Sequence, residues 1–278
     1  MIRRTVIRAA DLVAETLSRQ LRARVGRYLL NRASGDNEAD MERNGEAALL
    51  DRVRRALAGE PCVVFDVGAN FGLWTARLAP GLDRSSAVYA FEPVAPTFAR
   101  LRENLARLGP APRVVPVNAA LGDVDGEVEV FLIGGEGSGA HSLHERDLRA
   151  MGTTCTGQQP VRGYRGDTFC REYAIERIAF LKIDVEGHEL AVLRGFAAAL
   201  DEARIGALQF EYGGAWIDAR TYLRDAFELL QPRGYALGKL FPDGVVWHEH
   251  YDYGLETFQY ANFVAVRPEW KQHMRSLS

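Results

Sequence analysis

The sequence contains only three cysteines among its 278 residues, and it has no long apolar run. The cysteines are widely spaced and form no CxxC pair, so neither a disulfide framework nor a zinc knuckle is indicated. No apolar stretch approaches the ~18 residues that a membrane-spanning helix needs. Arg8, Asp11 and Glu15 interrupt any apolar core of a secretory signal. These absences predict a cytoplasmic protein with reduced thiols.

Lysine is scarce as well, because arginine supplies all but three of the 34 basic residues. The net charge of −3 argues against a strongly basic nucleic-acid-binding protein. Apolar residues make up 47% of the chain and charged residues 26%, which is typical of a globular protein. A chain of this length fits one elaborated domain better than two.

Residues 1–34 differ from the rest in charge. Eight arginines against two acidic residues give this segment a charge of +6, which leaves −9 for the remaining chain. Apolar residues at near-helical spacing predict a basic amphipathic helix over 1–34, within a helical N-terminal extension over 1–59. Such a helix could make a peripheral contact with the inner membrane surface. We favour the alternative, in which it packs on the folded domain or forms a homodimer with a second subunit.

From residue 60 to about residue 270, short apolar runs alternate with helical patterns. Continuously apolar strands joined by helices are typical of a parallel sheet that is covered on both faces. The sequence therefore predicts an α/β fold. Its buried strands are expected at 62–67, 87–91, 114–119, 179–185 and 207–211.

This alternation changes in two places. Strand periodicity over 127–133 predicts an inserted strand, and the glycine-rich stretch 134–160 predicts a loop. Near the end of the chain, strands at 235–240 and 261–266 are expected to form a terminal antiparallel hairpin, separated by a loop over 241–257.

The strongest chemical signal is the turn Asp66-Val-Gly68-Ala-Asn70-Phe-Gly72, directly after the first buried strand. Glycines at such a turn let the backbone approach a ligand, and the start of the next helix offers free N–H groups. The spacing is GxxxG, whereas dinucleotide-binding turns have GxGxxG. An acidic residue ahead of the turn would repel a pyrophosphate and attract an amino group. The turn therefore favours a sulfonium amino-acid cofactor over NAD.

Glu92 provides a second signal, 20 residues past Gly72 and at the tip of the second strand. A carboxylate in this position can accept hydrogen bonds from both hydroxyls of a ribose. Together with the glycine turn, Glu92 predicts a nucleoside site at the carboxyl edge of the sheet.

The segment AFLKIDVEGHE over 179–189 provides the third signal. An isolated charge on a buried strand is unfavourable, so Lys182 is expected to form a structural ion pair with a neighbouring carboxylate. Asp184, Glu186 and His188 lie where the strand ends and the next helix begins. Glu211 ends the following strand and would lie beside Asp184 if the two strands are adjacent.

The segments VVFDVGANFG, AFEPVAPTFARLRENL, VNAALGDVDGEVEV, FLKIDVEGHELAVLRG and LQFEYGG resemble, in this order, the FkbM family of S-adenosylmethionine-dependent methyltransferases. The resemblance covers about 60–266, so it assigns 60–270 to a methyltransferase domain. The stretch ERNGEAALL at 42–50 also resembles the lead-in of some members. The family implies a Rossmann-like class I fold with a mostly parallel seven-stranded sheet, into which a last antiparallel strand is inserted.

The resemblance also implies a cofactor site for S-adenosylmethionine and an activity. The expected activity is O-methylation of a hydroxyl, often in a sugar of a glycan or in a natural product, so the partner is a small-molecule or glycan acceptor. The residues implied are Asp66, Gly68, Asn70 and Gly72 for the methionine part, Glu92 for the ribose, and Asn118 and Ala119 for the adenine.

A protonated sugar hydroxyl is a poor nucleophile, so the reaction needs a general base or a metal that lowers the pKa of the hydroxyl. We favour His188 as the base, because histidine titrates near neutrality, with Asp184 and Glu211 in support. In the alternative, Asp184 and Glu211 hold a divalent ion such as Mg²⁺ through oxygen ligands.

Three other readings are weaker. An NAD-linked oxidoreductase would need the missing GxGxxG pattern. A non-catalytic nucleoside-binding module would not need acids at positions 184, 186 and 211. A Ser-His-Asp hydrolase would need a GxSxG turn, which is missing, and His141 and His144 are expected to be solvated.

Overall fold

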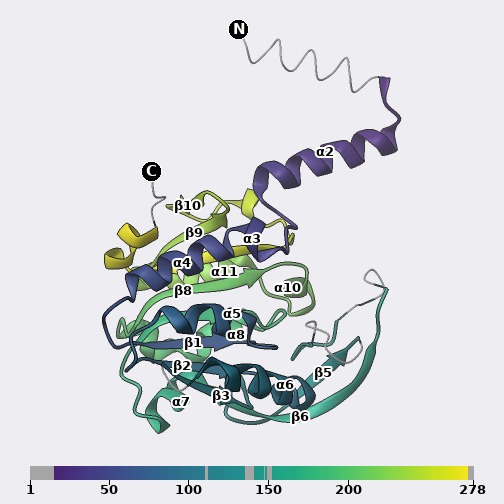
Figure 1. Ribbon diagram of the computed structural model, residues 1–278. Coiled ribbons are helices and arrows are strands. Elements are labelled where there is room, and N and C mark those ends of the chain that lie inside the picture. The colour runs from purple at the N-terminus through teal and green to yellow at the C-terminus, as the bar shows by residue number, and fades with distance from the viewer. Residues whose placement is uncertain (1–15, 110–111, 135–140, 147, 149–151, 275–278) are drawn as a thin grey trace.

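The computed structural model describes residues 16–109, 112–134, 141–146, 148 and 152–274. Its centre is an eight-stranded sheet, which Figure 1 shows between layers of helices. In spatial order the strands are β10 (Gly244–His248), β9 (Ala236–Phe241), β11 (Ala261–Val266), β8 (Ile205–Tyr212), β7 (Ile178–Ile183), β1 (Val63–Val67), β2 (Ala87–Phe91) and β3 (Arg113–Val117).

Five strands of this sheet, β1, β2, β3, β7 and β8, run parallel to one another. β11 lies between β8 and β9 and is antiparallel to both. This order and direction confirm the predicted Rossmann-like α/β fold with an antiparallel strand inserted near one edge. Because the carboxyl ends of β1, β2, β7 and β8 meet at one edge of the sheet, the loops that follow them can form a common site.

Helices cover both faces of the sheet, as the apolar strands require. One face is covered by α4 (Glu46–Ala56), α5 (Leu73–Leu78) and α6 (Ala95–Leu105), whose apolar residues pack on side chains of β1, β2 and β7. The opposite face is covered by α7 (Gly166–Glu172), α8 (Glu189–Gly195), α9 (Ala197–Asp201) and α11 (Leu223–Leu230). Two shorter helices are α3 (Met41–Asn44) and α10 (Ala215–Asp218).

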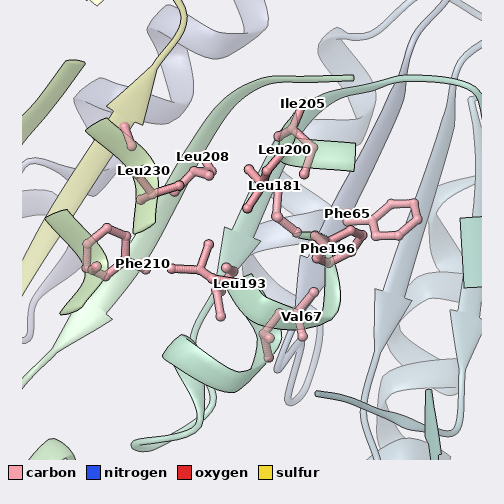
Figure 2. Packing of buried hydrophobic residues seen from close by; sticks show 14 of the residues in the cluster. Phe65, Val67, Leu181, Leu193, Phe196, Leu200, Ile205, Leu208, Phe210 and Leu230 are labelled. Atoms are coloured by element: carbon pink, nitrogen blue, oxygen red, sulfur yellow. The ribbon is translucent and has the colours of Figure 1, made fainter. Parts of the chain in front are cut away.

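The larger apolar cluster lies under α8, α9 and α11 (Figure 2). Leu193 and Phe196 pack there against Phe65, Leu181 and other fully buried side chains of the sheet. The ring of Phe65 also lies 5.2 Å from that of Phe91, measured between centroids. This packing fixes the spacing of β1, β2 and β7, whose ends form the site described below.

A second, three-stranded sheet is formed by β4 (Ala120–Gly122), β5 (Gly126–Ile133) and β6 (Cys155–Arg165). β5 confirms the predicted inserted strand. The prediction of a loop over 134–160 is wrong at its end, because β6 begins at Cys155 and pairs with β5 along nearly its whole length. The polar and glycine-containing sequence of β6 hid this strand, which is stabilised by its backbone pairing.

The predicted terminal hairpin is confirmed, since β9 and β11 pair antiparallel. The expected loop over 241–257 is only partly correct, because it contains β10, which makes the sheet eight-stranded where seven strands were predicted. The Pro242-Asp243-Gly244 sequence makes the tight turn between β9 and β10. Turn residues of this kind are a hairpin signal that the sequence analysis overlooked.

The N-terminal part contains a helix that the domain does not cover. α2 (Arg19–Ser34) has no buried residue and projects away from the sheet in Figure 1. The predicted helix began at residue 1, but residues 1–15 lie outside the described part. Packing of 1–34 on its own domain is therefore not seen for α2. By contrast, α4 contributes Leu49, Leu50 and Val53 to the apolar cluster on the sheet.

Within the described ranges, no helix combines the length and the apolar character that crossing a membrane requires. Residues 36 and 37 join α2 to the body of the protein. Asp36 forms an ion pair with the buried Lys239, and the backbone N–H of Asn37 donates to the carbonyl of Tyr260 at 2.9 Å. The C-terminal end of α2 is thus attached to the sheet through β9 and the residue that precedes β11.

We expect deletion of residues 1–30 to change the oligomeric mass more than it changes binding to liposomes. The reason is that α2 exposes Leu21, Val25, Tyr28 and Leu29 to between 40% and 64%, an apolar surface that a second copy could cover. The free energy of unfolding of the domain should change by less than about 0.5 kcal/mol, because none of the residues of α2 is buried. Light scattering and co-sedimentation with anionic liposomes provide the two measurements. Liposome binding that disappears on deletion, at unchanged mass, would contradict this expectation.

Candidate functional site

A cavity of about 270 Å³ opens at the carboxyl ends of β1, β2, β7 and β8. The turns after these strands, the start of the small sheet and residues 141–143 form its walls. Its polar lining comes mainly from Asn70, Glu92, Asp184, Glu186 and Glu211. Four of these five residues are carboxylic acids, so the cavity would suit a ligand with hydroxyl groups and a positive charge.

The glycine turn after β1 forms one wall of the cavity. Gly68 has a φ of +80°, and a Cβ at this position would lie 1.7 Å from the carbonyl oxygen of Asp184. Only glycine therefore allows the turn after β1 to lie this close to the end of β7. Asn70 follows with a φ of +48°, and its buried Oδ1 has no hydrogen-bond partner among the described residues. This oxygen is available to a donor on a ligand.

Two other members of the predicted turn do not line the cavity. Gly72 has a φ of +79°, and a Cβ there would lie 2.7 Å from the side chain of Leu101, so its role is to let α5 and α6 pack closely. Asp66 is fully buried and accepts a hydrogen bond from Thr75 Oγ1 at 2.6 Å. Asp66 therefore stabilises the turn by joining the end of β1 to α5, and it does not contact the cavity.

Glu92 lies where the sequence places it, at the end of β2 and in the cavity wall. Its Oε1 accepts a hydrogen bond from the backbone N–H of Val94 at 2.9 Å, and its Oε2 accepts one from Asn70 at 3.2 Å. Burial raises the pKa of Glu92 to about 7, although these two hydrogen bonds oppose the shift. Each oxygen keeps a lone pair, so Glu92 can still accept two hydroxyl groups.

The two residues predicted to contact the adenine differ in where they lie. Ala119 lines the cavity, whereas Asn118 does not. Asn118 Nδ2 donates to the carbonyl oxygens of Glu92 at 2.8 Å and Pro93 at 2.9 Å. Asn118 therefore fixes the loop that carries Glu92.

Lys182 lies between two carboxylates on adjacent strands. Its Nζ is 2.9 Å from Asp184 Oδ2 and 3.6 Å from Asp66 Oδ1, which confirms the predicted structural ion pair. Burial alone would lower the pKa of Lys182, but Asp184 and Asp66 outweigh it and raise the pKa, so the ammonium stays charged. Burial raises the pKa of Asp66, against the opposing effect of Lys182.

Asp184 and Glu211 are brought together in the cavity wall, because β7 and β8 are adjacent. Burial and then the charges of Asp184 and Glu186 raise the pKa of Glu211 well above its ordinary value. Burial opposes ionisation of Asp184, but the charge of Lys182 and hydrogen bonds with Glu211 and Lys182 together lower the pKa of Asp184. Of the pair, Glu211 therefore holds a proton more readily, whereas Asp184 ionises more readily and remains 37% exposed.

Glu186 connects the turn after β7 to a segment that covers the cavity. Its carboxylate forms an ion pair with Arg146 at 2.7 Å, and its carbonyl accepts a hydrogen bond from Ser142 Oγ at 2.8 Å. Burial and the charge of Asp184 raise the pKa of Glu186 to about 7. Within the same turn, Glu189 accepts the backbone N–H groups of Val185 and Gly187.

His188 does not reach the cavity. Its Nδ1 lies 3.1 Å from Nε2 of His144, and the ring lines a separate cavity beside β4. Burial and the nearby His144 lower the pKa of His188 to about 4. The expectation that His141 and His144 are solvated is wrong, since His141 Nδ1 accepts the N–H of Ile133 at 3.1 Å and lines the cavity.

The described residues contain no group of three or more histidine, cysteine, aspartate or glutamate side chains that could hold a metal ion. Asp184 and Glu211, which the alternative prediction assigned to Mg²⁺, make only a pair, and the ammonium of Lys182 already supplies positive charge beside Asp184. The metal-dependent reading therefore has no support in this geometry.

The residues that cover the site have no recognisable signal in the sequence. Ser142 and Arg146 lie about 40 residues before Glu186 in the chain, in a stretch that gave only a loop signal. Side chains in a loop follow no periodicity, so no pattern in the sequence could assign them to the cavity.

Comparison with known proteins gives a consistent picture. A family model described as the methyltransferase FkbM domain matches residues 66–237, more than half of the chain. The hexuronic acid methyltransferase AglP of Haloferax volcanii is 29% identical over 173 residues, which cover 61% of this chain and 64% of AglP. The chain thus spans less than two thirds of the length of AglP.

Two further proteins show more distant similarity. The 2-O-methyltransferase NoeI of Sinorhizobium fredii is 28% identical over 192 residues, which cover 66% of this chain and 76% of NoeI. The crystal structure of an O-methyltransferase from Bacillus cereus in complex with SAH has a TM-score of 0.43 and 14% identity, and the match covers 86% of this chain and 88% of that one. The fold assignment rests on the strand order of the sheet and not on this last likeness.

We expect Lys182→Met to lower the free energy of unfolding by about 3–5 kcal/mol, because it leaves the buried carboxylate of Asp66 without a cation. Urea denaturation measures the change. The matched control is Arg224→Met, which removes an exposed i,i+4 ion pair with Glu228 and should cost less than about 1 kcal/mol. Equal stability of Lys182→Met and the wild type would show that the ion pair does not support the fold.

Proposed function

Because the chain belongs to the methyltransferase FkbM domain family, we propose that it transfers a methyl group from S-adenosylmethionine to a hydroxyl of a sugar, in a glycan or a natural product. The observation that carries this proposal is one cavity with two ends. The glycine turn and Glu92 form a nucleoside-binding end, and Asp184 with Glu211 forms an end suited to deprotonating a hydroxyl.

The residues of the cavity fit this cofactor. Gly68 presents bare backbone, and the partnerless Oδ1 of Asn70 can accept a hydrogen bond from the amino group of the methionine part. Glu92 would accept the two ribose hydroxyls, and Ala119 would contact the adenine. The bound cofactor supplies an activated methyl group on a sulfonium. Asp66 supports the glycine turn without touching the ligand.

We assign the role of general base to the carboxyl pair and no longer to His188. Asp184 is ionised, partly exposed and part of the cavity wall, whereas His188 faces a different cavity. The hydroxyl that takes up the methyl group supplied by the cofactor would give its proton to Asp184. Glu211 holds the pair in place, and Lys182 keeps Asp184 charged until the proton arrives.

The relatives support a sugar as the acceptor. One is named for a hexuronic acid and the other for transfer to a 2-hydroxyl. Positioning of the acceptor against the methyl group would provide much of the acceleration, since an in-line displacement depends on the alignment of the reacting atoms.

The cofactor assignment predicts that Glu92→Ala weakens binding of S-adenosylhomocysteine by about 1.5–3 kcal/mol, the range for hydrogen bonds to a charged group. Titration calorimetry measures the affinity. The free energy of unfolding of the variant should also fall by about 1–3 kcal/mol, because two backbone N–H groups lose their hydrogen-bond acceptor. Glu103→Ala, on the exposed side of α6, is the matched control. Unchanged affinity in folded Glu92→Ala would remove the ribose assignment.

The same assignment predicts a pH dependence. The pKa of Glu92 is raised to about 7, and only the ionised carboxylate can accept two hydroxyl groups freely. Affinity for S-adenosylhomocysteine should therefore fall as the pH decreases from 8 to 6. Glu92→Gln cannot titrate, so its affinity should be lower at pH 8 and change less over this range. A dependence of the same size in Glu92→Gln would assign the titration to another group.

The choice of base predicts how variants affect turnover. Asp184→Asn should reduce kcat by about 10²–10⁴-fold, the usual contribution of a general base. His188→Ala should keep kcat within about fivefold, since its ring lies outside the cavity. Transfer of a labelled methyl group to a panel of methyl glycosides measures both, with cofactor affinity determined separately. A large loss in His188→Ala alone would return the role of base to the histidine.

A further inference from the structure

A ring of five polar side chains lies beside the carboxyl pair, outside the lining of the cofactor cavity. Three members come from the second half of the sheet and two from the N-terminal segment that precedes and begins α4. They are Asn44, Glu46, Gln209, Tyr260 and Asn262.

Glu46 and the Tyr260 hydroxyl are the shared acceptors of this ring, because each of them accepts two of its hydrogen bonds. Glu46 Oε2 accepts from Asn44 Nδ2 at 3.0 Å, and Oε1 accepts from Gln209 Nε2 at 2.7 Å. Gln209 Nε2 also donates to Asn262 Oδ1 at 3.0 Å. Asn44 Oδ1 accepts the backbone N–H of Glu46 at 2.9 Å. Glu46 therefore orients the amides of Asn44 and Gln209, and the oriented Gln209 in turn orients Asn262.

As a result, the amide nitrogens of Asn44 and Asn262 both point at the hydroxyl of Tyr260. The distances from these nitrogens to Tyr260 Oη are 3.4 Å and 3.3 Å. The phenolic oxygen thus accepts two N–H groups, and its own proton must point away from the ring. No acceptor for that proton is found in the ranges that the structure covers.

Tyr260 lies next to the carboxyl pair. Asn262, two residues later, pairs across the strands with Glu211, so Tyr260 comes just beyond Glu211 at the same edge of the sheet. Burial and then the negative charges of Glu211, Glu46 and Asp184 raise the pKa of Tyr260, which keeps its proton in place. The charged or titratable groups around Glu211 and Tyr260 are Asp184, Lys182, Glu186, Glu189 and Glu46.

We propose that Tyr260 is an acceptor-binding residue and that, together with the neighbouring Asp184–Glu211 pair, it binds two adjacent oxygens of a sugar. One hydroxyl gives its proton to Asp184 and receives the methyl group. The neighbouring oxygen accepts the hydrogen bond of the Tyr260 hydroxyl. The site thereby selects a vicinal diol, because it offers one hydrogen-bond acceptor and one donor side by side.

The ring explains why the donor is rigid. Glu46 and Asn44 lie more than 160 residues before Gln209 and Tyr260 in the chain, yet they fix the direction of the phenol. A preoriented donor loses less conformational freedom when the acceptor binds. The N-terminal segment around α3 and α4 is therefore part of the acceptor side of the site.

This inference rests on the proposed function, and the experiment separates the two. The protein is saturated with S-adenosylhomocysteine, and binding of methyl β-D-glucuronoside, methyl β-D-glucoside and their monodeoxy analogues is measured by calorimetry or saturation-transfer NMR. Failure to bind S-adenosylhomocysteine would reject the proposed function itself. Normal binding of S-adenosylhomocysteine leaves the sugar measurements as the test of Tyr260.

In the wild type, loss of either of two adjacent hydroxyls should weaken binding about three- to tenfold, the effect of one hydrogen bond. In Tyr260→Phe, removal of only one of these two hydroxyls should still weaken sugar binding, because the other hydroxyl has lost its partner. The affinity for S-adenosylhomocysteine should be unchanged. The matched control is Tyr235→Phe, which removes a buried hydroxyl that donates to the carbonyl of Ile205 at 2.6 Å, at the opposite end of β8. It should retain the preference for both hydroxyls.

Two results would overturn the inference. One is a wild type in which no pair of adjacent hydroxyls affects binding of any of these glycosides. The other is a Tyr260→Phe variant whose sugar affinity still falls when either hydroxyl is removed. That result would show that the phenol proton is not directed at the acceptor. Because the substitution removes a single oxygen and keeps the ring, thermal unfolding should confirm that the variant is folded.

Discussion

The buried ammonium of Lys182 is the interaction on which the site depends. It lies between Asp66 on β1 and Asp184 at the end of β7, two strands that pair directly in the sheet. Without this cation, burial and mutual repulsion would favour the protonated form of both carboxyl groups. Lys182 therefore allows Asp66 to support the glycine turn and Asp184 to remain charged in the cavity.

One lysine cannot neutralise the charge of all the acids in the cavity, and the excess of acidic groups shifts their pKa values. Burial raises the pKa of Glu92 and Glu186 to about 7 and that of Glu211 well above its ordinary value. Acids with raised pKa values next to an ionised Asp184 can share and accept protons near neutral pH. An acidic cavity of this kind also favours a positively charged sulfonium over the neutral product that remains after methyl transfer.

Segments that are distant in the sequence complete the site from two sides. Residues 141–146 reach over the cavity and are held by Glu186 through Ser142 and Arg146. On the other side, the end of α3 and the start of α4 reach Tyr260 and Gln209 through Asn44 and Glu46. The parallel strands thus provide the edge to which we assign the cofactor, and the added segments lie beside the part of the site that we assign to the acceptor.

The sequence by itself determined the strand and helix alternation, the glycine turn, Glu92 and the pairing of Lys182, because these follow from local periodicity and from the cost of burying a charge. Only the tertiary structure decided which side chains meet. Glu186 and Gly187 have φ values of +54° and +102°, and this turn leaves His188 beside β4 and not in the cavity. The ring around Tyr260 joins residues more than 200 positions apart, and no local pattern records such a contact. Side-chain direction at a turn and packing between distant segments depend on the whole fold, which is why the sequence located the edge of the site but not its acceptor side.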